Sequence, residues 1–254
     1  MTCETLPRAA PVSGPVLFGR YAFGPNRLGY CGTDDHAALL GHAATRDDPA
    51  LRTLARTFDG AYPYLQLIAS SAGIADPLDR RVVEAYWLGN ELTAGVTRAD
   101  LHRSMQGRFR GRMASTGWSW LEATVPAGAG PVHAFHVLDV FPRVGLLRGE
   151  QADDLLKVID SCRIRWGRVL SVDAGWMVVA TPTLELIDGK LRIGAGREEK
   201  VERWVDGIGF VDDVAPGDTV SLHWGWACDR LTPRQLANLV RWTDHQLRIA
   251  NRAI

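Results

Sequence analysis

The sequence carries its most promising metal ligands in two distant segments. Cys162 begins the stretch Cys-Arg-Ile-Arg-Trp-Gly-Arg-Val, and His223 begins a later stretch, His-Trp-Gly-Trp-Ala-Cys. A thiolate is a soft ligand and an imidazole a borderline one, and both suit transition metals such as iron. If the fold brings them together, we expect the Cys162 sulfur and a ring nitrogen of His223 to lie within about 6 Å of each other, close enough to share a metal after small movements.

Other cysteine and histidine residues could add ligands. Cys31 and His36, in Gly-Tyr-Cys-Gly-Thr-Asp-Asp-His, could contribute from a loop and the start of a helix. His133 and His136 would point to opposite faces of a strand, so they could share a metal only if their segment were helical or bulged. For Cys162 and His223 the alternative is simple packing in the core. We expect Cys228 to pack where the last strand joins the last helix.

Composition excludes several classes of partner. The 29 basic residues balance the 29 acidic ones, so the chain offers no strong positive field for nucleic acid or an anionic membrane. No apolar run approaches the roughly 20 residues of a bilayer span, and the N-terminus lacks the pattern of a secretory signal. The four cysteines include no Cys-x-x-Cys pair, which argues against a zinc ribbon. We expect a cytoplasmic protein that binds neither nucleic acid nor membrane.

Hydrophobic periodicity differs between the two parts of the chain. Apolar residues recur at helical spacing in much of the first part, whereas short β-rich segments separated by turns dominate after residue 161. The segment 131–141 is also β-rich and is predicted as a strand. Asp-Gly pairs at 188–189 and 206–207 are typical hairpin turns. Thr232-Pro-Arg-Gln235 has the pattern of a capping box that begins a C-terminal helix.

These patterns predict an α+β fold. We expect a mostly helical domain over residues 1–150, followed over 151–254 by a small OB-like β-barrel with a trailing C-terminal helix. The interior of the barrel should contain Val169, Val178, Val179, Val220 and Leu222. The patterns assign no role to residues 1–150.

Two motifs in residues 160–250 resemble the hydrogenase maturation chaperones of the HypC/HupF type. The first is Cys162 followed by Gly167, Arg168 and Val169. The second reads Gly-Asp-x-Val-x-x-His-x-Gly-aromatic-Ala and spans residues 217–227. In that family the cysteine is at the extreme N-terminus, whereas here it is internal. Residues 17–36 resemble an uncharacterised bacterial family associated with hydrogenase gene clusters.

The resemblance implies a metal carrier rather than an enzyme that turns over. In such a carrier Cys162 would bind iron and the partner, and His223 would be its companion near the metal. The cargo would be a transient Fe(CN)2CO unit, and the partners would be a nickel–iron hydrogenase large subunit or a HypD-like maturation protein.

Two alternatives remain open. In an iron-dependent metalloenzyme, Cys31, His36, His133 or His136 would join the two main ligands. In an interaction protein, the barrel would persist without a metal. Two exchangeable ligands fit a carrier, whereas three or more with an open position fit catalysis.

Overall fold

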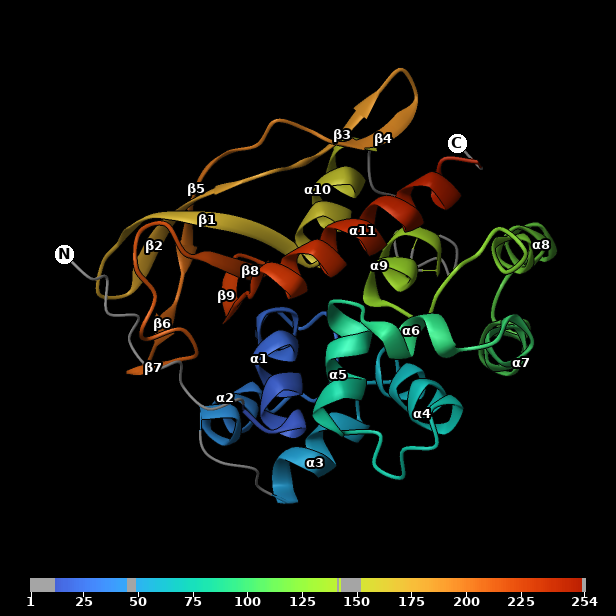
Figure 1. Cartoon of the computed structure of the whole chain (residues 1–254), viewed down its shortest axis with the longest axis horizontal. Helices are drawn as coiled ribbons and strands as arrows, with labels where there is room; N and C mark the ends of the chain where they lie inside the picture. Colours follow the sequence, from blue (N-terminus) through green and yellow to red (C-terminus); the bar gives the residue numbers. More distant parts are fainter. Residues whose placement is uncertain (1–11, 45–48, 141, 143–151, 253–254) are drawn as a thin grey trace.

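The structure is a computed structural model that describes residues 12–44, 49–140, 142 and 152–252. Helices occupy the first part of the chain, strands most of the second, and a helix ends the described chain (Figure 1). The helices are α1 (Gly14–Arg27), α2 (His36–Ala44), α3 (Pro49–Arg56), α4 (Tyr62–Ser71), α5 (Arg80–Trp87), α6 (Glu91–Gly95), α7 (Arg98–Phe109), α8 (Ser115–Thr124), α9 (His133–Phe135), the π-helix η1 (His136–Val140), α10 (Ala152–Cys162) and α11 (Pro233–Ala250). The strands are β1 (Arg165–Val172), β2 (Trp176–Thr181), β3 (Leu184–Ile187), β4 (Lys190–Ile193), β5 (Arg197–Glu202), β6 (Trp204–Val205), β7 (Ile208–Gly209), β8 (Thr219–His223) and β9 (Trp226–Arg230). The expected mixture of N-terminal helices, strands and a C-terminal helix is therefore confirmed.

Five strands form a ring in the order β1-β2-β5-β9-β8, and β8 pairs again with β1. Most pairs are antiparallel, whereas β5 meets β9 through one parallel pair, Glu202 with Trp226. The ring encloses its own apolar cluster: Val169, Met177, Val179, Val201, Val211, Val214, Val220, Leu222 and Ala227. Val178 is only half-buried, so its predicted place inside was wrong. Side chains alternate along a strand, and the neighbours of Val178 in β2 take the inner face.

Two hairpins turn at the predicted Asp-Gly pairs. Asp188 and Gly189 join β3 to β4, and Asp206 and Gly207 join β6 to β7. All four residues have positive φ, between 51° and 79°, as a type I′ turn requires. The capping box that begins α11 is also present, because Thr232 and Gln235 bond each other's backbone N–H.

The segment 131–141 is not the predicted strand. Its described part forms α9 and η1, and residue 141 lies outside the described residues. Every residue from 132 to 140 except His136 is buried. A helix that is buried on all sides shows no amphipathic period, so its β-branched and aromatic content resembles that of a buried strand. The predicted boundary near residue 150 falls on 143–151, which are also outside the described residues.

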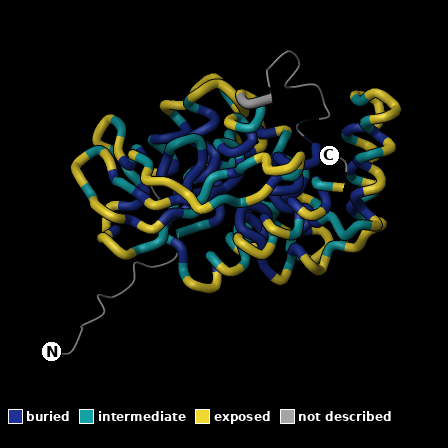
Figure 2. The backbone as a smooth tube through the Cα atoms, turned by 90° about the horizontal axis from the view of Figure 1, so that it is seen from above, coloured by how far each residue is buried: buried dark blue, intermediate teal, exposed yellow. Residues whose placement is uncertain are grey.

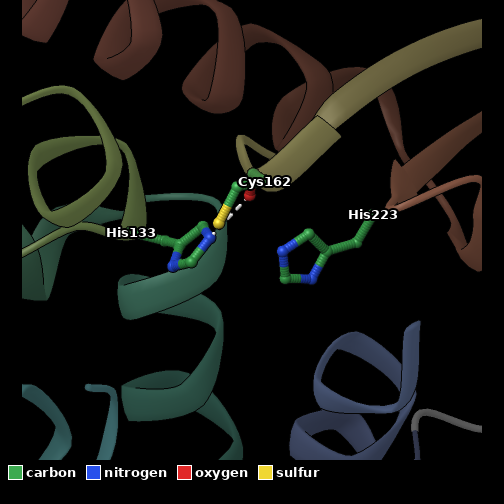
Figure 3. Close-up of side chains that lie close together, drawn as sticks. All are labelled: His133, Cys162 and His223. Atoms are coloured by element: carbon green, nitrogen blue, oxygen red, sulfur yellow. Dashed lines mark hydrogen bonds between the residues drawn. The ribbon is translucent and has the colours of Figure 1, made fainter. Parts of the chain in front are cut away.

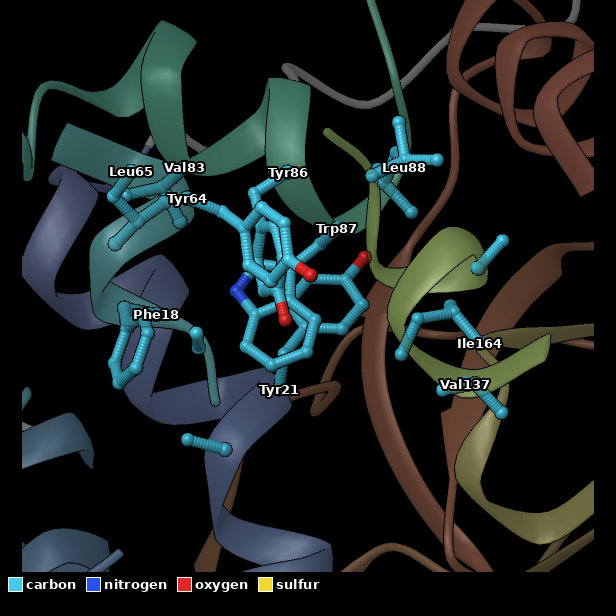
Figure 4. Packing of buried hydrophobic residues seen from close by; sticks show 14 of the residues in the cluster. Phe18, Tyr21, Tyr64, Leu65, Val83, Tyr86, Trp87, Leu88, Val137 and Ile164 are labelled. Carbon is cyan, nitrogen blue, oxygen red and sulfur yellow. The ribbon is translucent and has the colours of Figure 1, made fainter. Parts of the chain in front are cut away.

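One large apolar cluster joins the helices to the outside of the ring. Helix α1 packs against α5 on one side and against β8 and β9 on the other. Aromatic side chains pack between the helices. Tyr21 of α1 stacks on Trp87 of α5, and Tyr64 of α4 stacks on Tyr86 of α5, each pair at 5.5 Å between ring centroids (Figure 4). The buried segments run through the middle of the molecule beneath an exposed outer layer (Figure 2). Among the described helices, none has the length and hydropathy needed to cross a bilayer.

The close packing of α1 against β8 depends on a glycine. A Cβ atom added to Gly24 would lie 2.4 Å from the carbonyl oxygen of His223 and 3.3 Å from the Cβ of Trp226. The first distance is too short for any side chain. We therefore expect the helix to move away from the strand if Gly24 is replaced.

Gly24→Ala should lower the free energy of unfolding by about 1–3 kcal/mol, the usual cost of overpacking a core. The matched control is Gly107→Ala in α7, where an added Cβ meets nothing within 4 Å beyond its own helix. That variant should be up to about 1 kcal/mol more stable, because alanine favours the helix. Urea unfolding of both variants measures the difference, and equal stabilities would contradict the packing argument.

Candidate metal site

Three potential ligands from separate elements meet beside α1. One ligand atom each from His133, Cys162 and His223 lies within 4.8 Å of the other two (Figure 3). His133 begins α9, Cys162 ends α10 and His223 ends β8. The predicted proximity of Cys162 and His223 is therefore confirmed. His133 was considered only as a weaker candidate, because its segment was predicted as a strand.

Cys162 is held by the hydrogen bonds at the end of α10. The last turn of a helix leaves carbonyl groups without intrahelical partners. Here His133 Nε2 donates to the carbonyl of Cys162 at 2.8 Å, and the backbone N–H of Trp224 donates to the carbonyl of Ser161 at 2.9 Å. The end of α10 thus joins α9 to the turn that follows β8.

Two buried arginines fix the junction between α10 and β1. The guanidinium of Arg163 donates to Asp160 at 2.8 Å, and the same carboxylate accepts the backbone N–H of Leu184 in β3 at 3.0 Å. Arg165 makes two hydrogen bonds to Glu199 in β5, at 2.7 and 2.8 Å. Paired charges of this geometry limit the movement of the segment that carries Cys162.

The ring of His223 has one nitrogen occupied and one free. Its Nδ1 lies 2.7 Å from the carbonyl oxygen of Tyr21 in α1, so Nδ1 carries the proton and donates it. Its Nε2 then has a lone pair and is buried with no hydrogen bond of acceptable geometry, although the Cys162 backbone lies close enough to oppose the fall of the His223 pKa. Figure 3 shows that this edge of the ring faces Cys162 and His133. Metal-bound histidines have this arrangement, in which the second nitrogen donates to a fixed acceptor.

His133 has partners on both ring nitrogens. Nε2 donates to the carbonyl of Cys162, and Nδ1 lies 3.1 Å from the hydroxyl of Tyr86, which can donate to it. The Tyr86 hydroxyl is also 3.3 Å from the carbonyl of Gly60. If Nε2 became a ligand, the ring proton would move to Nδ1 and point at Tyr86, whose own proton would turn to Gly60. The surroundings of His133 therefore accept either tautomer.

Burial sets the protonation of the cluster. It lowers the pKa of His133 to about 4 and that of His223 well below its usual range. Burial raises the pKa of Cys162 to about 12, although the indole N–H of Trp224 opposes this rise. Near neutral pH the metal-free cluster is therefore a thiol and two neutral imidazoles. A metal that binds must displace the thiol proton.

The other predicted ligands do not join this group. Cys31 is exposed in the loop after α1, and His36 is exposed at the start of α2. Although the residue as a whole is exposed, its thiol is turned inward, and this burial, followed by the influence of the Cys162 thiol, raises the pKa of Cys31 to about 12. His136 lies 3.4 Å from the Tyr64 hydroxyl. Cys228 is buried in the core, as expected, although within β9.

The buried histidines should make the protein sensitive to acid. Their folded-state pKa lies below the unfolded value, so below about pH 6.5 the unfolded chain binds protons that the folded chain excludes. Between pH 7 and pH 5, the free energy of unfolding should fall by about 2 kcal/mol for His133, and His136 and His223, whose pKa values burial also lowers, should add to this fall. Urea unfolding with a chelator present measures this slope.

The slope can be assigned with two variants. His223→Asn keeps a donor for the Tyr21 carbonyl without a titrating ring, and it should remove about one histidine's share of the slope. His36→Asn, at an exposed histidine, is the matched control. A slope that is unchanged in His223→Asn would contradict the view that this ring is neutral in the fold.

Comparison with known proteins identifies the family of the chain from a match over almost all of its length. A search of curated proteins and a search of solved structures each returned no match. Residues 10–254 match one family model, described as a family of unknown function (DUF6390). The chain therefore belongs to the DUF6390 family.

Proposed function

We propose that this chain binds a transition metal through Cys162, His223 and His133, and that it holds an iron unit during maturation of a nickel–iron hydrogenase. The observation that carries the metal proposal is the buried Nε2 of His223, which has no hydrogen-bond partner and faces the Cys162 thiol. An unsatisfied buried polar atom costs about 1–3 kcal/mol. A bound metal would satisfy it.

The donor set suits a transition metal. One thiolate and two imidazoles are soft and borderline ligands, which favour iron, zinc or copper over Mg²⁺ and Ca²⁺. The nearest buried arginines are each paired with a carboxylate, Arg163 with Asp160 and Arg165 with Glu199, which offsets part of the repulsion that Arg165 exerts on positive charge at His223. Burial disfavours the thiolate form of Cys162. A bound cation would stabilise that form.

The role in hydrogenase maturation rests on the resemblance to HypC-type chaperones. In this proposal the five-stranded ring is the small OB-like barrel of that family, and Cys162 and His223 carry the Fe(CN)2CO cargo. Helices α1, α5 and α9 cover the ligands, so the N-terminal part would replace a separate HypD-like scaffold. The recipient would be the hydrogenase large subunit, in the cytoplasm.

An iron-dependent metalloenzyme is the second candidate. The presence of His133 favours it, because three protein ligands that leave a fourth position open are typical of catalytic metals. A carrier must instead give up its metal, and His133 can return to its hydrogen bond with the Cys162 carbonyl. The two functions differ in the other ligands of the metal. A carrier would hold iron with carbon monoxide and cyanide bound to it, whereas a metalloenzyme would hold a metal without them.

Metal binding should release one proton. Cys162 is protonated across the neutral range and both histidines are already neutral, so affinity should rise about tenfold for each pH unit between pH 6 and pH 9. Titration with Co²⁺, followed by its thiolate charge-transfer absorption, measures affinity at each pH. A pH-independent affinity would mean that Cys162 is not a ligand.

Cys162→Ser should lose the iron unit while keeping the fold, because a serine hydroxyl stays protonated and is a poor ligand for iron. The measurement is infrared detection of carbon monoxide and cyanide on chain purified anaerobically from cells that make a nickel–iron hydrogenase. Hydrogenase maturation and the melting temperature are scored beside it. His223→Ala should weaken retention less, since the thiolate remains.

Cys228→Ala is the matched control, because it removes a buried sulfur outside the cluster. It should keep the infrared bands even if it melts at a lower temperature. Metal on the wild-type chain without these bands would favour the metalloenzyme. A wild-type chain that binds no metal through Cys162 would overturn the proposed function.

A further inference from the structure

Two stacked aromatic rings lie beside Cys162, which is half-buried. The backbone N–H of Trp224 donates to the carbonyl of Ser161 at 2.9 Å, and its buried indole N–H opposes the rise of the Cys162 pKa that burial causes. Tyr30 covers Trp224, with ring centroids 3.9 Å apart and planes inclined by 20°. Tyr30 itself is 55% exposed. Tyr30 is therefore the outer ring of the stack and the half-buried Trp224 the inner one, next to the half-buried Cys162.

The other aromatic side chains next to His133 and His223 belong to the hydrophobic core. Trp87 lies 4.8 Å from the ring of His133 and 5.7 Å from that of His223, and Tyr86 lies 5.6 Å from His133. Both aromatic residues are buried in the cluster that joins the helices to the ring of strands. Trp224 and Tyr30, in contrast, are half-buried and exposed, respectively.

Trp224 occupies a backbone position that does not suit it. Trp224 and Gly225 have φ of 52° and 72° at the turn between β8 and β9. Such turns favour Asn-Gly, and a bulky residue with positive φ costs about 1–3 kcal/mol. Strain of this kind is typical of residues kept for a ligand site. The ring of Trp224, rather than its turn propensity, explains its presence.

Tyr30 lies between two glycines of the loop that follows α1. Gly29 and Gly32 have φ of 76° and 85°, so the backbone on each side of Tyr30 and Cys31 can rotate more freely than other residues allow. The side chain of Asn26 holds the loop through the carbonyls of Cys31 and Thr33, at 2.7 and 2.6 Å. The backbone N–H of Tyr30 donates to the carbonyl of Pro25 in α1 at 3.0 Å, so the movement that uncovers Trp224 is a rotation of the Tyr30 side chain.

We propose that the Tyr30–Trp224 stack is the gate of the metal site, through which a thiophilic metal ion or metal complex reaches Cys162 and leaves it. The metal cargo rests on the proposed function above, whereas the route to the Cys162 sulfur can be tested without metal.

The first test measures alkylation of each cysteine in the full, metal-free chain by mass spectrometry of its peptides. Tyr30→Ala should increase the alkylation rate of Cys162 about tenfold or more, because less local opening is needed. Cys228, which is 0% exposed, should react no faster and so reports on global unfolding. Trp224→Asn, which suits the turn, should also accelerate Cys162. Trp176→Ala, at an exposed tryptophan on β2, is the matched control.

The second test follows Co²⁺ by stopped flow, with association started by mixing and dissociation by a chelator. Tyr30→Ala should raise both rates by a similar factor and leave Kd unchanged within about threefold, because Tyr30 contributes no ligand. Tyr30→Phe keeps the stacked ring and should behave as wild type.

The outcomes separate the gate from the metal proposal. Wild-type rates in Tyr30→Ala, for both alkylation and Co²⁺, would overturn the gate even if the metal binds. Equal acceleration of Cys162 and Cys228 in both variants would also overturn it, because the opening would then be global. Faster alkylation of Cys162 alone, in a chain that binds no Co²⁺, would support the gate and overturn the proposed function.

Discussion

The hydrogen bond from His223 Nδ1 to the carbonyl of Tyr21 is the interaction on which the candidate site depends. It joins the end of β8 to the middle of α1, and it places the ring proton on Nδ1. Nε2 is thereby left with a lone pair that faces Cys162. The bond requires α1 to approach β8 closely, which Gly24 permits by having no side chain. A feature of backbone packing thus decides which atom of His223 is available.

Burial then makes the cluster neutral without a metal. A desolvated imidazole loses its proton and a desolvated thiol keeps one, so none of the three side chains carries a charge near pH 7. This neutrality lets the cluster be buried at low cost, but it leaves Nε2 of His223 unsatisfied. The same burial therefore keeps the cluster uncharged and leaves the lone pair of His223 Nε2 without a partner.

Local signals were the predictable part of this fold. The Asp-Gly turns and the capping box at Thr232 depend on neighbouring residues alone, and both are present as predicted. Val178 was misplaced because a run of β-branched residues does not show which face of the strand is buried. Cys162 and His223 could be paired because their motifs resemble those of a known family in content and order.

The part played by His133 could not be predicted, because it depends on tertiary structure. The segment around it is apolar on every side, so its periodicity does not distinguish a strand from a buried helix. Only the helical form, packed against α5 and α11, directs the ring at the end of α10. The sequence pointed to His133 in one way only. His133 and His136 could share a metal if their segment were helical or bulged, so a helix there would make them candidate ligands.

The three ligands come from both parts of the chain. His133 precedes residue 150, whereas Cys162 and His223 follow it, and the bond that orients His223 returns to α1. Neither part alone contains the full set, so the site exists only when helices and strands pack together. A ligand that binds only the assembled form stabilises that form in proportion to its affinity. Metal bound by all three residues would therefore also help to hold the two parts of the chain together.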